Sequence, residues 1–572
     1  MNLKSGNSIS KALLVFLIAW GGLNLLQAFL TPLNADEAYY WMYSQYLAWG
    51  FFDHPPMIAL MIRIGDLFFN NELGVRFLVV LSQIGALFII WKLIDKDKAL
   101  NKGSVFLFIM LVSILPVFNI YGFMATPDAP LIFFTVVFLL AYKQILEEEN
   151  WQNTLFLGLS MAALMYSKYH GALLIILVVI SNPKLLKSLQ FYIASIIGVI
   201  LFLPHLYWQY SNDFPSLKYH LVERVSGFVL ANVPQYLLNQ LLIHNPFILP
   251  VCIWLIFKKK AKNQFEKTLN YIVVGFIGFF FISSFRYHVE PQWTALIAIP
   301  IIIILINNLD LKLGVARYIK WVAIFLFPIL LFVRIAFMAD FLPVSYLKKG
   351  YHNNRMRAMD ISKIAGDRPV VFTNAYQDAA EYTFYTGKFA HTLDNLNYRK
   401  TQYDLWDFEE RIHGKEVLYV PHYLTDYIRE NFTKYKLSAG DSVFVKVYKD
   451  FQSLQRECVI LTDENYSFKK SGDNTISLKI FNPYPYSIDF MNKEFPVVFQ
   501  IAFIKNGVMQ AKKNLQLPDN ISILNAGDTI SVDCHFTIED LATGVYRLGI
   551  CSETGTLYDT YNSTFKNVTV IE

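Results

Sequence analysis

Long apolar runs dominate the first 340 residues of this chain and limit what it can fold into. A helix needs about 20 apolar residues to cross the hydrocarbon core of a bilayer. The chain is 54% hydrophobic and only 17% charged, whereas soluble domains carry about 25% charged residues. We therefore expect a polytopic α-helical membrane protein with about eleven transmembrane helices. The candidate spans are residues 12–30, 75–94, 103–121, 127–145, 153–167, 170–182, 189–208, 240–257, 269–285, 293–308 and 318–338.

The charged loops between these runs predict the orientation of the chain. Lys and Arg concentrate in alternate segments, such as KLIDKDKALNK, NPKLLK and KKKAKNQFEK, and basic residues accumulate on the cytoplasmic side. The N-terminal run resembles a signal peptide in its flanks, but it is about 20 residues long and has no small-residue cleavage pattern, so we expect an uncleaved first span. The sequence thus predicts a multi-pass membrane protein with a cytoplasmic N-terminus and a C-terminal region on the outside.

The character of the chain changes near residue 340. We expect a transmembrane domain over 1–340, a periplasmic α/β domain over 341–450 and a β-sandwich domain over 451–572. The segments RPVVFTN and EVLYVPHYL predict buried strands on either side of a helix in NAYQDAAEYTFYTG. Farther on, TISLKIFN, VVFQIAFIKNG and TISVDCHFTI alternate between turns, which is typical of a sandwich of about seven strands. Cys458, Cys534 and Cys551 allow at most one disulfide, and free thiols are an equal alternative.

Ionisable side chains gather in the loops that the charge pattern places outside. These loops contain DEAYYW, FFDHPP, ATPDAP, SKYH and FRYHVEPQW. Charge inside a membrane is costly, roughly 2.5–3.5 kcal/mol at the bilayer centre, so such groups usually mark pathways or sites. Cations can hold a phosphate while a carboxylate accepts the proton of an incoming nucleophile. The set therefore suits a reaction on a phosphate-bearing lipid at headgroup depth.

Taken in order, these motifs resemble those of the GT-C glycosyltransferases of family 39, the branch with protein O-mannosyltransferases and bacterial aminoarabinose transferases. The resemblance covers about residues 10 to 340. One departure from the family pattern is Gln292, where Asn is commoner. The matching segments are ADEAYY, FFDHPPMIAL, ATPDAPLIFF, SKYHGALL, LFLPHLYWQYSNDFPSLKYHLVER and VEPQWTALIAIP.

The resemblance implies a GT-C fold and an enzyme, a hexosyl- or pentosyltransferase. It would move a sugar from a polyprenyl-phosphate donor to a periplasmic acceptor, a lipid, a glycan or a protein, with inversion. The expected partners are membrane lipid, the lipid-linked sugar and the acceptor, with no nucleic acid. No cofactor or metal is expected to be required, although some GT-C enzymes use a divalent cation. One alternative is a transporter or flippase of a lipid-linked saccharide, which would place charges near the bilayer midplane. Another is a non-catalytic envelope assembly protein.

The resemblance also implies roles for individual residues. The expected catalytic carboxylates are Asp36, Glu37 and Asp128, with Asp36 as general base or as the group that orients the acceptor. The residues expected to hold the donor phosphate are His54, Lys168 and Arg286. The residues expected to line the acceptor or sugar pocket are Tyr40, Asp53, Tyr169, His288, Glu290 and Trp293.

Several of these residues have a structural alternative. Glu37 could cap or brace its helix, and His54 could be a hydrogen-bond partner of Asp53. Lys168 could extend to the interface without a ligand. The aromatic residues of the YYW segment are typical of interfacial anchors as well as of sugar-stacking platforms.

Overall fold

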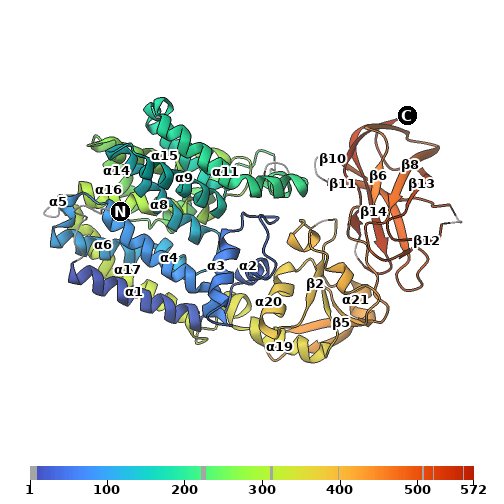
Figure 1. Ribbon diagram of the computed structural model, residues 1–572. Helices are drawn as coiled ribbons and strands as arrows, with labels where there is room; N and C mark the ends of the chain where they lie inside the picture. The colour runs from blue at the N-terminus through green and yellow to red at the C-terminus, as the bar shows by residue number, and fades with distance from the viewer. Residues whose placement is uncertain are drawn as a thin grey trace. The chain divides into compact units, whose positions relative to one another are not determined.

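The computed structural model describes residues 10–220, 227–309, 314–396, 398–505, 508–518, 521–557 and 559–572. The chain divides into two compact units, Met1–Asn354 and Arg355–Glu572. Helices fill the first unit, and strands form most of the second (Figure 1). Parts of the predicted cytoplasmic segments, and the end of the predicted strand segment VVFQIAFIKNG, lie outside the described residues.

The helices of the first unit follow the apolar runs of the sequence. They are α1 (Lys11–Leu30), α2 (Ala35–Gln45), α3 (Met57–Asp66), α4 (Glu72–Leu93), α5 (Lys96–Ala99), α6 (Lys102–Ile114), α7 (Pro116–Ile120), α8 (Asp128–Glu147), α9 (Trp151–Ser167), α10 (His170–Ser181), η1 (Pro183–Lys187), α11 (Leu189–Ser211), α12 (Pro215–Lys218), α13 (Asn232–Ile243), α14 (Leu249–Lys258), α15 (Gln264–Ser283), η3 (Pro291–Ile297), α16 (Ala298–Asn308), α17 (Gly314–Met338), α18 (Ser345–Leu347) and η4 (Lys348–His352).

Within the described residues, seven helical segments are long and apolar enough to cross a membrane: α1, α4, α8, α11, α15, the joined η3–α16 segment and α17. The apolar helices α6, α10 and α14 are shorter. Each predicted run overlaps at least one helix. The prediction of a polytopic helical membrane protein is therefore confirmed.

Two predicted spans are interrupted by proline. The run 240–257 contains the end of α13 and most of α14, with a break at Asn245, whose φ is 70° and which precedes Pro246. A residue before proline avoids the helical region, so the first helix ends there. The run 103–121 is likewise divided into α6 and α7, and α7 begins at Pro116. The first outside loop is also partly helical, because it contains α2 and α3.

The centre of the first unit is α16, whose residues are all buried. Around it, α4 packs against α1 and α8, and α8 packs against α9. By contrast, most of α17 is exposed in the isolated chain, as expected for a helix that faces lipid. The packing of α1, α4, α8 and α9 brings the segments between these helices to one end of the unit, where the predicted site residues lie.

The second unit begins with a mixed five-stranded sheet of order β2-β1-β3-β5-β4. Strands β1 and β2 are parallel, with Val370 opposite Ala390, and β1 and β3 are parallel, with Val370 opposite Leu418. β5 runs antiparallel to β3 and β4. The predicted helix is present as α20. The elements are α19 (Asn354–Ala365), β1 (Val370–Thr373), α20 (Tyr376–Thr386), β2 (Ala390–Leu393), η5 (Gln402–Asp404), η6 (Glu409–Arg411), β3 (Val417–Val420), α21 (Asp426–Asn431), β4 (Thr433–Lys436) and β5 (Ser442–Tyr448).

Two facing sheets and a short two-stranded sheet, β12-β9, form the rest of the second unit. One facing sheet has the order β11-β10-β14-β16-β7, with β15 beside β14, and the other has the order β13-β8-β6. Alternate side chains of β8 and β13 are buried and join those of β10 and β14 in one apolar core. The strands are β6 (Val459–Leu461), β7 (Asn465–Lys469), β8 (Asp473–Phe481), β9 (Ile488–Asp489), β10 (Val497–Lys505), β11 (Val508–Asn514), β12 (Ile523–Leu524), β13 (Thr529–Thr537), β14 (Gly544–Thr554), β15 (Thr560–Tyr561) and β16 (Lys566–Ile571). The strands exceed the predicted seven because short edge strands such as β9, β12 and β15 carry too few residues to show a pattern.

The four cysteines are buried free thiols. Of the two alternatives left open by the sequence, the structure therefore contains the thiols.

Candidate active site

The start of α2 is fixed by its own side chains. Asn34 is the N-cap, and its side-chain oxygen accepts the backbone N–H of Asp36 at 3.0 Å. The carboxylate of Glu37 accepts the backbone N–H of Asn34, also at 3.0 Å. This capping box satisfies N–H groups that have no partner within the helix. It holds the half-buried Asp36 in the first turn of α2.

Glu37 is also one half of a fully buried ion pair with Arg76 of α4, and both side chains are 0% exposed. The Arg76 guanidinium donates to both carboxylate oxygens, at 2.7 and 2.5 Å. It also donates to the backbone carbonyls of Ala28, Thr31 and Pro32 at 3.1, 2.5 and 3.0 Å. All five guanidinium N–H groups therefore have acceptors. The pair ties the end of α1 and the start of α2 to α4.

A second acidic segment meets the first at the same carboxylate. The backbone N–H of Ala125 donates to Glu37 Oε1 at 2.7 Å, and α8 begins three residues later at Asp128. The Nζ of Lys168 lies 2.7 Å from Asp128 Oδ1, and each side chain is 5% exposed. Lys168 is the residue that caps the end of α9. The structure thus brings Asp36 and Glu37 together with Asp128 and Lys168 from three separate segments.

The FFDHPP segment packs back onto α2. Both Tyr39 and Tyr43 donate their hydroxyls to Asp53 Oδ2, each at 3.1 Å. The ring of His54 lies 5.9 Å from that of Tyr40, centroid to centroid. Asp53 thus receives tyrosine hydroxyls, while His54 and Tyr40 face each other beside it.

Tyr169, next to Lys168 in the chain, belongs to a polar network that links this segment to α11. Its hydroxyl lies 2.9 Å from His205 Nε2 and accepts a hydrogen bond from Gln209 at 3.0 Å. His205 Nδ1 lies 2.8 Å from the carbonyl oxygen of Trp49. Gln209 donates in turn to Ser216. The network positions the chain that leads into the FFDHPP segment.

The fifth outside loop contributes an aromatic cluster. Trp293 is buried, and its ring lies 5.5 Å from that of His170 and 5.9 Å from that of Tyr287. His288 and Glu290 form a looser, half-exposed pair, with 3.8 Å between Nε2 and Oε2. Arg286 lies exposed on the turn that follows α15.

Tyr121 lies where these groups approach one another. The charges of Asp128 and Glu290 both act on its hydroxyl, as does Tyr351. Tyr351 in turn accepts a hydrogen bond from the Asn34 side chain at 3.2 Å. The segments predicted as the first, second and fifth outside loops therefore share one neighbourhood.

Sequence reasoning did not single out Arg76, His205, Gln209 or Tyr351. Arg76 sits at the start of an apolar run and is indistinguishable there from a basic anchor. His205 and Gln209 are polar residues one turn apart in the otherwise apolar α11, and this spacing was the available signal. Tyr351 follows the last span, in a segment without a periodic pattern.

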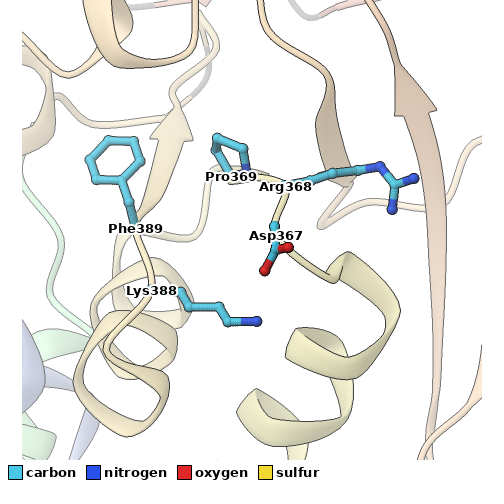
Figure 2. A pocket seen from close by; sticks show the side chains of 5 residues that line it. All are labelled: Asp367, Arg368, Pro369, Lys388 and Phe389. Atoms are coloured by element: carbon cyan, nitrogen blue, oxygen red, sulfur yellow. The ribbon is translucent and has the colours of Figure 1, made fainter.

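The described part of the chain contains no group of three or more His, Cys, Asp or Glu side chains arranged to hold a metal ion. The second unit has a hollow of about 190 Å³ lined by Asp367, Arg368, Pro369, Lys388 and Phe389 (Figure 2). Its cations already have partners: Arg368 pairs with Glu416 at 2.5 Å, and Lys388 donates to the carbonyl oxygen of Gly366 at 2.6 Å. No predicted site residue lines this hollow.

Comparison with known proteins gives consistent results. Residues 53–208 match the family described as dolichyl-phosphate-mannose-protein mannosyltransferase. Lipid A galacturonosyltransferase RgtD from Rhizobium johnstonii is 24% identical over 262 residues, which are 42% of this chain and 53% of that protein. The match thus spans about half the length of this relative.

The fold is that of ArnT from Cupriavidus metallidurans. The apo crystal structure matches with a TM-score of 0.55 at 12% identity, over 76% of this chain and 97% of ArnT. The structure of ArnT bound to undecaprenyl phosphate matches with a TM-score of 0.53 at 13% identity and the same coverage. Together with the long apolar helices, these matches show that the chain is a multi-pass membrane protein with the fold of ArnT and that it is similar to glycosyltransferases.

Proposed function

We propose that the chain is an integral membrane glycosyltransferase. It transfers a sugar from a polyprenyl-phosphate donor to an acceptor on the periplasmic face. The observation that supports this most directly is the meeting of Asp36, Asp128 and Lys168, from segments far apart in the sequence, at one end of the helical unit. A proton acceptor and a buried cation then lie in the same neighbourhood, as a reaction on a sugar phosphate needs.

In the proposed reaction, the bond between the sugar C1 and the phosphate oxygen breaks, and a bond between C1 and an acceptor oxygen forms. The acceptor proton goes to Asp36, and polyprenyl phosphate leaves. Attack from the side opposite the phosphate inverts the configuration at C1. Asp36 suits the role of base because it is half-buried at the first turn of α2. Glu37 is committed to Arg76, Asn34 and Ala125, so we assign it to positioning Asp36.

We assign the donor phosphate to Lys168, His54 and Arg286. Lys168 has three N–H donors and gives one to Asp128, which leaves capacity for phosphate oxygens. ArnT, which shares the fold, has been crystallised with undecaprenyl phosphate, and a lipid phosphate of this kind is the donor group we propose here. We assign the acceptor or sugar pocket to Tyr40, Asp53, Tyr169, His288, Glu290 and Trp293. No metal enters this scheme.

The proposed orientation places the N-terminus in the cytoplasm and the second unit in the periplasm of a bacterial inner membrane. It follows from the distribution of Lys and Arg among the loops. The acceptor is then a lipid, a glycan or a protein on the periplasmic side. RgtD is named for lipid A, which supports a lipid acceptor of the envelope as the first to test. No nucleic acid is among the proposed partners.

The test is to incubate the purified protein, in lipid nanodiscs, with a panel of polyprenyl-phosphate sugars and envelope acceptors. Mass analysis of the products should show one acceptor heavier by a sugar residue, together with free polyprenyl phosphate. Asp36→Asn protein is the matched control and should yield no such product. In parallel, a fluorescent lipid-linked sugar in proteoliposomes reports movement between leaflets. Movement without any sugar transfer would replace the proposal with the transporter alternative.

A further inference from the structure

The five-stranded sheet of the second unit has a topological switch point. From β1 the chain crosses through α20 to β2 on one side, and it then returns to β3 on the other side of β1. The three strands are parallel, so their carboxyl ends meet at one edge, formed by Thr373, Leu393 and Val420. In open α/β sheets, ligands bind outside the carboxyl ends of the strands at such a point.

Asn374 follows β1 at this edge and has an unused donor. The residue is 2% exposed, and its Oδ1 accepts the backbone N–H of Asn395 at 2.9 Å. Within the described residues, its Nδ2 has no hydrogen-bond partner. Because both atoms belong to one carboxamide, the unused donor lies between the ends of β1 and β2. A buried amide donor without a partner costs roughly 1–3 kcal/mol, which a ligand oxygen would remove.

Phenolic and guanidinium side chains lie on the segments that follow the same three strands. Arg399 donates to the hydroxyl of Tyr376, the first residue of α20, at 2.9 Å and lies 4.9 Å above its ring. Burial and, after it, the charge of Asp394 raise the pKa of Tyr398 to about 12, while Arg399 lowers it and Tyr423 raises it. Tyr423, which follows β3, is 53% exposed. The ends of β1, β2 and β3 therefore present side chains to one another.

We call Asn374, Tyr376, Tyr398, Arg399 and Tyr423 the strand-end cluster. Tyrosine rings pack against the C–H faces of sugar rings, while phenol, amide and guanidinium groups hydrogen-bond to sugar hydroxyls. The unit that holds the cluster has, in its described part, no helix long and apolar enough to cross a membrane. The phenol, amide and guanidinium groups of the cluster suit the hydroxyls of a saccharide better than an apolar polyprenyl chain.

We propose that the strand-end cluster binds the saccharide portion of the acceptor. The identification of the ligand as acceptor rests on the proposed transferase function, whereas saccharide binding at the cluster does not. The cluster selects which periplasmic saccharide is brought to the enzyme, and the first unit performs the transfer.

The test measures binding of the full-length purified protein, fluorescently labelled, to an array of defined neutral, amino and acidic oligosaccharides without any donor. Wild type should bind a subset of the array. Three variants remove single groups: Asn374→Gly, which keeps a residue suited to the φ of 51° found there, Tyr398→Phe and Tyr423→Ala. Each should weaken binding roughly three- to tenfold, the scale of one lost hydrogen bond or stacking contact.

Two matched controls lie elsewhere on the same unit. Tyr435→Ala removes another exposed tyrosine, on β4, and Lys388→Ala alters the hollow of Figure 2. Both should bind like wild type. The proposal would be overturned if wild type bound no oligosaccharide on the array. It would also be overturned if all three cluster variants bound as tightly as wild type. Asp36→Asn protein should still bind, so loss of transfer with intact array binding refutes only the transferase function.

Discussion

The two units of the chain both bury carboxylates, but they neutralise them by different means. In the first unit Glu37 faces Arg76, and Asp128 faces Lys168. In the second unit two carboxyls share the hydroxyl of Thr401, whose Oγ1 lies 3.2 Å from Asp394 and 3.3 Å from Asp404. One hydroxyl proton cannot serve both acceptors. The second pair therefore lowers its charge by holding a proton of its own.

The two pairs differ in whether a proton or a cation accompanies the buried carboxyls. Burial raises the pKa of Asp394, and the neighbouring Asp404 raises it further; burial likewise raises the pKa of Asp404. The end of the first unit instead places a buried cation against each carboxylate, Arg76 against Glu37 and Lys168 against Asp128.

The largest expected effect tests the ionic half of this comparison. Arg76→Met leaves Glu37 buried without its cation, and it frees three backbone carbonyls. We expect the free energy of unfolding to fall by about 3–5 kcal/mol. Thermal unfolding of the purified protein in detergent, followed by tryptophan fluorescence, measures the change.

The double variant Glu37→Gln/Arg76→Met controls for the loss of packing. Because it removes both charges, it should be less destabilised than the sum of the two single variants. An Arg76→Met protein that unfolds at the wild-type temperature would show that the contacts of Arg76 with Glu37 and the three carbonyls are not needed for stability.

The second effect separates the adjacent carboxylates Asp36 and Glu37. Asp36→Asn should lower sugar transfer by roughly a hundredfold or more, the scale for removing a general base. Thermal unfolding should stay at the wild-type temperature, because the capping box and the Arg76 contacts involve Glu37. Glu37→Gln should instead reduce stability and activity together. Normal turnover in Asp36→Asn protein would show that Asp36 is not the general base.

The third effect tests the carboxyl pair of the second unit, Asp394 and Asp404. Since the folded pKa values of Asp394 and Asp404 are raised, the unfolded chain releases its proton first as pH rises above the ordinary value of 3.8. Above that pH the unfolded state binds fewer protons, so stability falls with pH, by up to about 1.4 kcal/mol per unit. The fall continues until the pH reaches the folded pKa.

Asp404→Asn supplies an amide donor in place of the shared proton and should flatten this slope. Calorimetric unfolding of wild type and variant between about pH 5 and pH 8 compares the two. The variant should be relatively more stable at the alkaline end. Parallel pH profiles for both proteins would mean that no proton is shared.

The sequence predicted the helical architecture well because membrane spans depend on length and hydropathy, which are local properties. It also placed Asp36, Glu37, Asp128 and Lys168 after alternate predicted spans, and the structure brings these segments into contact through Glu37–Ala125 and Asp128–Lys168. It did not predict the pairing of Arg76 with Glu37, since the acceptors of Arg76 include backbone carbonyls, which have no sequence signature. The same limit applied to Tyr169, whose partners His205 and Gln209 lie on α11 and meet it only after packing.

In the second unit, the pattern of strands was visible but the Asp394–Asp404 pair was not. The two residues are ten positions apart across an irregular segment, and only the fold of that segment brings both to Thr401. The broken span at Asn245 was also missed, although Pro246 is visible in the sequence, because hydropathy alone continues through it. Prediction from periodicity therefore missed long-range polar contacts and the proline break.

The smallest expected effect shows that burial, not distance, decides the value of an ion pair. Lys566 and Glu464 in the second unit approach to 2.6 Å, about as closely as Lys168 and Asp128, but their side chains are 21% and 84% exposed. Glu464→Gln should lower the free energy of unfolding by about 0.2–1 kcal/mol, because water screens the pair. Chemical unfolding at low and high salt measures this, and the effect should shrink further in salt. Lys168→Met, at equal distance but 5% exposure, should cost several times more; equal costs for the two variants would mean that the contrast between buried and exposed charge does not govern this protein.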